Sequence, residues 1–255
     1  MNKRPKILIT NDDGINAKGI RRLIEFVKDF ADVVVFAPNK PQSGMGHAVT
    51  INNPIKFQLI QKDKFYAEYS CSGTPVDCIK LAFDTIYKRT HPDLCISGIN
   101  HGSNSSVNLL YSGTMAAAIE AAMANVPAIG FSLLDFAEDA NFDLAKEYIV
   151  KIIKNVLTNG LKERTCLNVN IPKGKIKGIK VVRQSKAYWV ETFEERYDPY
   201  KRPYYWMLGE FINLDEGNDT DEHALKNAYI SIVPIQLDLT CYESINMIKK
   251  WDLKT

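Results

Sequence analysis

Short apolar runs alternate along this chain with stretches of helical periodicity, and this alternation limits the possible folds more than any other feature. Residues 6–10 and 32–36 are runs of strand length rich in Ile and Val, and apolar residues recur at helix spacing over residues 20–27. A strand, a helix and a second strand in about 30 residues form a βαβ unit, which requires a parallel sheet with right-handed crossovers. The sequence therefore predicts an α/β fold.

The same alternation continues as far as residue 157. Thr74 and Pro75 favour the start of a helix, because Thr caps helices well and Pro fits their first turn. A hairpin inserted in a crossover is predicted at residues 51–69, and two further strands at residues 93–97 and 128–132. Three helices are predicted at residues 74–86, 113–125 and 142–157. We therefore expect a core built on a mainly parallel sheet.

The character of the sequence changes after Arg183. Residues 185–210 contain eight large aromatic side chains, interleaved with charges and two prolines, without helical or strand period. Such a density of aromatics fits an extended arm better than a core element. Residues 229–235 return to a strand pattern, and residues 244–251 predict a short closing helix.

Composition sets the class of protein but not its function. Hydrophobic residues make up 45% of the 255 and charged residues 24%, as in an average globular domain, so disorder, collagen-like sequence and coiled coil are excluded as overall descriptions. The net charge of +2 provides no field that attracts a nucleic-acid polymer or a membrane. We expect residues 1–184 to form one α/β core, and residues 185–255 to form the arm, the returning strand and the closing helix.

The N-terminus and the cysteines predict a cytoplasmic protein. Only three apolar residues, 7–9, follow the basic N-terminus, which is too few for a signal peptide. The longest apolar-rich stretch, 115–131, is interrupted by Glu120, Asn125 and Pro127, so it cannot span a bilayer. Five cysteines, an odd number without a CxxC pair, favour reduced thiols over a zinc site or a disulfide framework.

Two adjacent carboxylates, Asp12 and Asp13, follow the first expected strand. Ligands bind at the carboxyl ends of strands in open α/β sheets, and a buried carboxylate is costly unless a cation or hydrogen bonds stabilise it. A capping turn is the alternative interpretation, because Asn and Asp favour turns. This motif alone does not separate the two.

Two further loops follow strands, at residues 37–47 and 98–106, and would project from the same edge of the sheet. They would bring the Ser43 hydroxyl and the Asn100 amide oxygen to the two aspartates. Hard oxygen ligands of this kind suit Mg²⁺, Mn²⁺ or Ca²⁺ rather than zinc or copper.

The helix expected at 113–125 begins with Ser112, Gly113 and Thr114. Unpaired backbone N–H groups, two hydroxyls and a glycine at a helix N-terminus form an anion site, whereas a simple Ser cap would use only one hydroxyl. A metal ion beside such a terminus suits phosphoryl hydrolysis, because the ion activates water and the N–H donors stabilise the developing charge.

These motifs together resemble the SurE family (survival protein E), the 5′/3′-nucleotidases, from about residue 6 to about residue 240. The matching stretches are 9–14 (ITNDDG), 37–38 (AP), 42–44 (QSG), 72–78 (SGTPVDC), 97–100 (SGIN), 111–114 (YSGT), 204–206 (YYW), 220–221 (TD) and 229–234 (YISIVP). The resemblance implies a Rossmann-like three-layer α/β core and a C-terminal arm that is exchanged between the subunits of a homodimer or homotetramer.

The resemblance also implies an activity and a site. The family hydrolyses nucleoside 5′- and 3′-monophosphates to nucleoside and phosphate by attack of metal-activated water, and some members act on short polyphosphate. One divalent ion per subunit, Mg²⁺ or Mn²⁺ with Ca²⁺ also able to fit, falls on Asp12, Asp13, Ser43 and Asn100, and the two aspartates are the expected catalytic residues. The expected phosphate and substrate contacts are Asn11, Gly44, Asn104, Ser112, Gly113 and Thr114.

The sequence departs from the family pattern after Asn104. Many members carry Leu-Gly and then an Asp where this chain has Ser105, Ser106 and Asn108, so we expect altered metal preference or substrate choice. For His101 we favour a neutral supporting or surface role over substrate contact. His47 lies in the Ser43 loop, and for this residue we favour no part in the reaction over assistance in proton transfer.

Three other classes of protein compete with this interpretation. A haloacid dehalogenase-type phosphatase requires Asp-x-Asp, and the adjacent Asp12 and Asp13 break that spacing. A nucleotide-binding module would keep the anion pocket without a metal, which leaves the paired carboxylates unexplained. A glycosyltransferase also uses acidic metal ligands, but only one βαβ-type core is evident, which leaves little room for its usual second domain.

Overall fold

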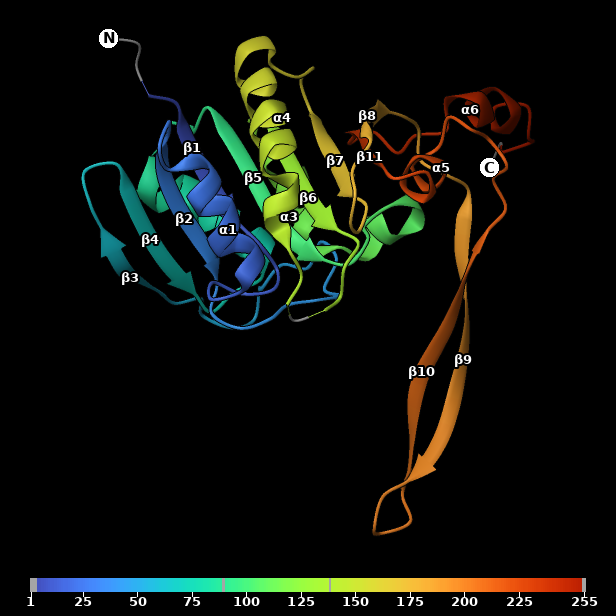
Figure 1. Ribbon diagram of the computed structural model, residues 1–255. Helices are drawn as coiled ribbons and strands as arrows, with labels where there is room; N and C mark the ends of the chain where they lie inside the picture. The colour runs from blue at the N-terminus through green and yellow to red at the C-terminus, as the bar shows by residue number, and fades with distance from the viewer. Residues whose placement is uncertain (1–3, 89, 138, 254–255) are drawn as a thin grey trace.

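Two layers of helices cover a twisted central sheet in the computed structural model, which describes residues 4–88, 90–137 and 139–253 (Figure 1). The strands are β1 (Lys6–Thr10), β2 (Asp32–Pro38), β3 (Phe57–Lys62), β4 (Tyr66–Cys71), β5 (Leu94–His101), β6 (Ala128–Leu133), β7 (Thr165–Ile171), β8 (Gly178–Val181), β9 (Ala187–Tyr197), β10 (Pro203–Asn213) and β11 (Tyr229–Gln236). The α-helices are α1 (Lys18–Val27), α2 (Pro75–Leu81), α3 (Gly113–Met123), α4 (Lys146–Asn159), α5 (Asp221–Lys226) and α6 (Tyr242–Ile248).

Nine strands of the described residues form one sheet in the order β3-β4-β2-β1-β5-β6-β7-β11-β8. From β4 to β7 every neighbouring pair is parallel, whereas β3 is antiparallel to β4 and β11 is antiparallel to β7. The sheet is therefore mainly parallel, as the alternation of strands and helices predicted.

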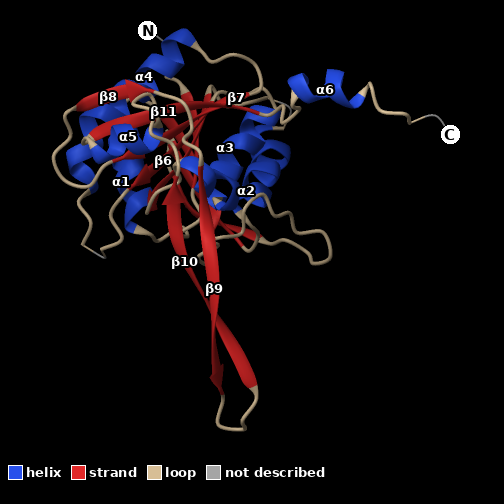
Figure 2. Cartoon of the chain, turned by 90° about the vertical axis from the view of Figure 1, so that its right-hand side faces the viewer, coloured by secondary structure: helices blue, strands red, loops and turns tan. Residues whose placement is uncertain are grey.

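The two faces of the sheet bury separate apolar clusters. Ile7 and Ile9 of β1 join a cluster with α1 and α4, and Leu8 between them joins a cluster with α2 and α3. This follows from strand geometry, because successive side chains point to opposite faces. Figure 2 shows α2 and α3 on one side of the sheet and α1 and α4 on the other, which confirms the three-layer core.

Three loops meet where β1, β2 and β5 end, at what we call the carboxyl edge of the sheet. The backbone N–H of Gln42 donates to the carbonyl of Asp12 at 2.7 Å, and the N–H of Gly46 donates to the carbonyl of Tyr111 at 3.1 Å. The N–H of His101 donates to Oδ2 of Asp13 at 3.3 Å. These contacts join the segments after β1, β2 and β5 to the segment that leads into α3.

The region predicted as an extended arm without strand period is instead a long β-hairpin. β9 and β10 pair only with each other in the described structure, in register from Ala187 with Asn213 to Tyr197 with Pro203. Both views show the hairpin projecting away from the body (Figures 1 and 2). Its strands carry no polar–apolar alternation because nearly all of their side chains are exposed on both faces.

Several elements differ from the prediction in detail. β7, β8 and α5 were not predicted, although β7 lies inside the sheet between β6 and β11. A 3₁₀ turn over Phe142–Ala145 precedes α4, and a π-helical turn over Ala82–Tyr87 extends α2. Residues 1–3 and 254–255, at the outer ends of the two expected parts of the chain, lie outside the described residues.

The expected returning strand is β11, which inserts between β7 and β8, and the expected closing helix is α6. The expected hairpin at 51–69 is present as β3 and β4. In the part of the chain that the structure describes, no helix combines the length and the apolar character that crossing a membrane requires.

Candidate active site

Asp12 lies against the first turn of α3. Its side chain is 3% exposed, and its Oδ1 accepts a hydrogen bond from the hydroxyl of Thr114. A Cβ built on Gly113 would lie 2.8 Å from the Cβ of Asp12 and 3.0 Å from its Oδ2. Glycine at 113 is therefore what allows the carboxylate and the helix N-terminus to approach so closely.

Asp12 is buried and Asp13 is partly buried, and burial affects the pKa of both carboxyls. Burial raises the pKa of Asp12 to about 6; hydrogen bonds from Thr114 oppose the rise and the neighbouring charge of Asp13 adds to it. Burial also raises the pKa of Asp13, against a hydrogen bond from the backbone of His101. None of the ion pairs among the described residues involves either carboxylate. A bound divalent cation would remove both penalties.

The other two predicted metal ligands differ in how firmly they are held. Asn100 is buried, and its Nδ2 donates to the carbonyl of Gly102 at 3.0 Å, which leaves the amide oxygen as the free ligand atom. Ser43 is exposed and has no hydrogen bond to the other three predicted ligands in the described structure, but it is the residue after Gln42, which bonds to Asp12. The fold thus gathers Asp12, Asp13 and Asn100 and brings the Ser43 loop beside them.

The predicted site contains only two carboxylates. Across residues 4–88, 90–137 and 139–253, no group of three or more His, Cys, Asp and Glu side chains is arranged to hold a metal ion. A metal at the carboxyl edge would therefore depend on the neutral oxygens of Ser43 and Asn100 as well. That donor set is compatible with Mg²⁺, Mn²⁺ or Ca²⁺ and unsuited to softer metals.

The hydroxyls predicted for the phosphate pocket have partners within the protein. Oγ of Ser112 accepts the backbone N–H of Met115 at 3.0 Å, so Ser112 is the N-cap of α3. The Thr114 hydroxyl donates to Asp12. The anion donors that this turn offers are therefore chiefly the backbone N–H groups at the start of α3, which lack intrahelical partners.

The remaining predicted pocket residues lie in three loops. Asn11 donates from Nδ2 to the carbonyl of Gly14 at 2.9 Å, and its buried Oδ1 has no partner among the described residues. Gly44 is exposed and has a φ of +73°, which favours glycine. Asn104 is buried, and its Nδ2 donates to the hydroxyl of Ser132 at 2.8 Å.

Two buried asparagines of β7, which were not predicted as site residues, contact the backbone of Asn104. Oδ1 of Asn170 accepts the N–H of Asn104 at 2.8 Å, and Nδ2 of Asn168 donates to its carbonyl at 2.7 Å. The signal in the sequence is an Asn-x-Asn pattern inside an otherwise apolar run, because polar residues in a central strand need a specific partner.

The three positions that depart from the family pattern all contact the C-terminal part of the chain. Ser105 donates to Glu222, and the N–H of Ser106 donates to Oδ2 of Asp221 at 2.8 Å. The indole N–H of Trp189, at the base of the hairpin, donates to Oδ1 of Asn108 at 2.7 Å. These contacts join the loop after β5 to α5 and β9.

The two histidines near the site have structural contacts. The ring of His101 packs edge-on against Phe142, and its Nδ1 lies 3.3 Å from the carbonyl of Asp135. Nε2 of His47 lies 2.9 Å from Glu120 of α3, which also accepts from Lys80 at 2.5 Å. Burial would raise the pKa of Glu120, but the bonds from His47 and Lys80 outweigh it and lower the pKa. His47 therefore ties the Ser43 loop to the body.

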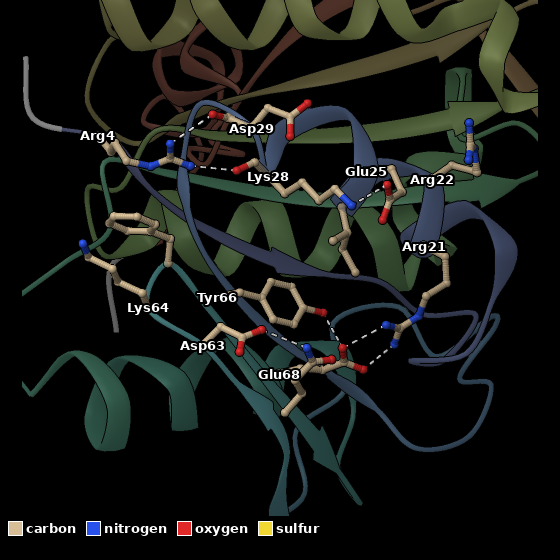
Figure 3. Close-up of a pocket in the computed structure, with 13 residues that line it drawn as sticks. Arg4, Arg21, Arg22, Glu25, Lys28, Asp29, Asp63, Lys64, Tyr66 and Glu68 are labelled. Atoms are coloured by element: carbon tan, nitrogen blue, oxygen red, sulfur yellow. Dashed lines mark hydrogen bonds and ion pairs between the residues drawn. The ribbon is translucent and has the colours of Figure 1, made fainter.

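A separate groove of about 560 Å³ lies between α1 and the β3–β4 hairpin (Figure 3). Four of the five basic side chains that line it are already paired, and Nζ of the fifth, Lys64, lies 4.9 Å from the centroid of the Phe65 ring. The ion pairs are Arg4 with Asp32, Arg21 with Glu68, Arg22 with Asp143 and Lys28 with Glu25. This groove therefore offers no anion site comparable with the carboxyl edge.

Comparison with known proteins gives a consistent result over the whole chain. Residues 7–191 match the sequence model of the family described as survival protein SurE. The 5′-nucleotidase SurE of Christiangramia forsetii is 55% identical and that of Flavobacterium psychrophilum 54% identical, with 98% of each chain covered in both cases. The crystal structure of the SurE protein from Aquifex aeolicus matches with a TM-score of 0.83 at 39% identity, covering 96% of this chain and 98% of that one.

Proposed function

The chain belongs to the SurE family, and we propose that it is a metal-dependent phosphomonoesterase that hydrolyses nucleoside 5′- and 3′-monophosphates to nucleoside and phosphate. The printed name of its relatives, 5′-nucleotidase, supports this class of substrate. The observation that carries the proposal is the position of Asp12, a buried carboxylate pressed against the N-terminus of α3 beside a second carboxylate. That arrangement brings together a cation site and an anion site.

One divalent ion per subunit, Mg²⁺ or Mn²⁺ with Ca²⁺ also able to fit, would be held by Asp12, Asp13, Asn100 and Ser43. The raised pKa values of the two aspartates support this, because such carboxylates are stabilised by a cation. When bound, the ion would polarise the phosphoryl group and lower the pKa of a water molecule.

The residues of the chain bind and orient the phosphate ester. The N–H groups at the start of α3 and the amide of Asn104 donate to phosphate oxygens, and the helix N–H groups stabilise the charge that develops on these oxygens. Thr114 engages Oδ1 of Asp12 and so fixes the orientation of the carboxylate. Oδ2 of Asp12 is then the oxygen free to contact the cation or to accept a proton from the attacking water.

Release of phosphate from 5′-AMP, 5′-GMP and 3′-AMP, with Mn²⁺, Mg²⁺, Ca²⁺ or EDTA, tests the proposal. We expect release that depends on the metal and is lost with EDTA. Short polyphosphate belongs in the same panel, as the side substrate that the family resemblance implies. Absence of release with every divalent ion would favour a nucleotide-binding module, and a trapped phospho-aspartyl enzyme would overturn direct attack by water.

The hairpin β9–β10 is proposed to join subunits into a homodimer or homotetramer. Phe193, Tyr205 and Trp206 are all more than half exposed on it, and exposed apolar surface of this kind marks an interaction site. Light scattering on the purified chain and on a variant with a shortened hairpin tests this. We also propose a cytoplasmic location, which the free thiols Cys71, Cys78, Cys95, Cys166 and Cys241 support.

A further inference from the structure

A row of buried polar side chains crosses the face of the sheet that α3 covers. Neighbouring strands place Asn100 beside Ser132, Ser132 beside Asn170 and Asn170 beside Ser231. All four are at most 9% exposed. Buried polar groups are costly unless they are hydrogen-bonded, so this row at the carboxyl edge needs a reason.

Three hydrogen bonds join Asn170 of this row, Asn168 of the same strand and the backbone of Asn104 in the loop after β5, and we call this set the amide ring. The N–H of Asn104 donates to Oδ1 of Asn170 at 2.8 Å, and Nδ2 of Asn170 donates to Oδ1 of Asn168 at 2.9 Å. Nδ2 of Asn168 donates to the carbonyl of Asn104 at 2.7 Å and closes the ring.

The backbone of Asn104 dictates how both amides are turned. A peptide N–H can only donate and a carbonyl can only accept, so Asn170 must present its oxygen and Asn168 its nitrogen to Asn104. Only then does the nitrogen of Asn170 meet the oxygen of Asn168. The ring therefore has a single consistent arrangement, and it fixes the peptide groups on both sides of the Asn104 Cα.

We propose that Asn168 and Asn170 are positioning residues of the phosphate pocket, which hold the backbone of Asn104 so that its side-chain amide is aimed at a phosphate oxygen. This rests on the proposed function. Nδ2 of Asn104 carries two hydrogens and gives one to Ser132 at 2.8 Å, which leaves the second for a ligand. Rigid support of this kind lowers the cost of ordering the site when substrate binds.

A purely structural role fits these residues less well. β7 already pairs with β6 on one side and with β11 on the other, so its own place in the sheet does not require the two amides. What the ring adds is a connection to the loop. In the described structure neither asparagine forms a hydrogen bond to Asp12, Asp13 or Ser43, so their loss is expected to weaken phosphate binding and to leave metal binding unchanged.

The test replaces Asn168 or Asn170 with Leu, which has a similar volume and cannot hydrogen-bond. For each single variant we expect KM for 5′-AMP and the inhibition constant of inorganic phosphate to rise about tenfold, the effect of one lost hydrogen bond. We expect kcat to change by less than about threefold, since a contact present before and during the reaction mainly affects KM. Mn²⁺ affinity, measured by calorimetry, stays within about twofold of wild type.

Two control variants separate positioning from general damage. Val169→Ala lies between the two asparagines but faces the other helix layer, so it lowers stability by leaving a cavity without touching Asn104. Ser231→Ala removes a buried hydroxyl that neighbours Asn170 and has no partner in the described structure. Both are expected to keep the wild-type inhibition constant for phosphate.

A folded Asn168→Leu or Asn170→Leu variant with wild-type KM and inhibition constant overturns the proposal, and so does an equal rise in Val169→Ala. Where a Leu variant fails to fold, the corresponding Ala variant is judged by the same thresholds. If the wild type hydrolyses no phosphate ester, the proposed function fails separately. Binding of inorganic phosphate to the Mn²⁺-loaded protein, measured by calorimetry, then decides whether the ring supports a phosphate site.

Discussion

The carboxyl edge of the sheet and the β9–β10 hairpin reverse the usual distribution of side chains in opposite ways. At the edge, Asp12 and Asn170 are buried although they are polar, with 3% and 0% exposure. On the hairpin, Phe193 and Trp206 are exposed although they are apolar, with 65% and 57% exposure. Each reversal costs stability within a single chain, which points to a ligand at the edge and to a protein surface on the hairpin.

Asp12→Asn removes the charge at the edge and has the largest expected effect. Phosphate release should fall by about a thousandfold or more, because the variant loses a predicted metal ligand. At pH 8 the metal-free variant should also melt several degrees higher than metal-free wild type. An acid whose pKa is raised in the folded state destabilises it once ionised, and a rise from 3.8 to about 6 corresponds to about 3 kcal/mol.

Thermal melting from pH 4 to pH 8 without metal checks the sign of this effect. As the pH rises from about 4 through about 6, wild type should lose stability relative to Asp12→Asn. Asp29→Asn, an exposed carboxylate in the turn after α1, serves as the control and should change neither activity nor melting. Near-normal turnover by Asp12→Asn would contradict the assignment of Asp12 as a catalytic residue.

Thr114→Val tests the support of the same carboxylate. The substitution keeps the shape of the side chain and removes the hydroxyl that donates to Asp12. A hydrogen bond to a charged group of this kind predicts a loss of about 10- to 100-fold in kcat/KM. Thr114→Ser retains the hydroxyl and should keep most of the activity. Equal losses in the Val and Ser variants would mean that packing, rather than the hydrogen bond, matters at this position.

Phe193→Asp tests the proposal that the exposed apolar surface of the β9–β10 hairpin joins subunits. Because this side chain is exposed on the hairpin, we expect the unfolding free energy of the single chain to change by less than about 0.5 kcal/mol. The mass in solution, measured by light scattering, should fall at least about twofold, because a charge would be buried in the proposed contact. Leu144→Asp, at an exposed apolar position away from the hairpin, should leave the mass unchanged. An unaltered mass in both variants contradicts the role of the hairpin.

Glu68→Gln has the smallest expected effect and contrasts a paired buried carboxylate with Asp12. Burial would raise the pKa of Glu68, but hydrogen bonds from Arg21 and Tyr66 outweigh it and leave the pKa below its usual value. Such an acid adds stability above its unfolded pKa and loses it as the pH falls through its folded pKa. Because Arg21 is partly exposed, the substitution should cost only about 1 kcal/mol at pH 7.

Urea unfolding at pH 7 and pH 3 measures this difference. It should be smaller at pH 3 than at pH 7, because the stability that ionised Glu68 contributes is lost as the pH falls through its lowered folded pKa. The sign of the pH dependence is thus opposite to that expected for Asp12. A Glu68→Gln variant whose deficit grew as the pH fell would show that the ion pair in Figure 3 does not govern this carboxylate.

The predicted fold was correct where strands are continuous apolar runs. Residues 6–10 and 32–36 are buried by helices on both faces, so their pattern identifies β1 and β2 directly. β7 escaped prediction because Asn168 and Asn170 interrupt its apolar run. Strands β9 and β10 of the hairpin were not predicted, because side chains that are exposed on both faces show no alternation of polar and apolar residues.

Prediction of the site had a similar limit. Asp12 and Asp13 are adjacent in sequence, so their shared position after β1 was apparent, and the family that the motifs resembled is confirmed by the comparisons. The partners of the loop after β5 were not apparent, because they are distant in sequence. Asn104 bonds to a residue 66 positions later, and Ser106 to one 115 positions later. Only tertiary structure brings such pairs together.

These long separations determine when, during synthesis, the pocket is completed. A growing chain that has emerged as far as α3 already contains both aspartates and the helix terminus beside them. It does not yet contain Asn168, Asn170 or Asp221, which hold the loop after β5. Because contacts between distant residues form late in folding, an unfinished chain has an unsupported pocket.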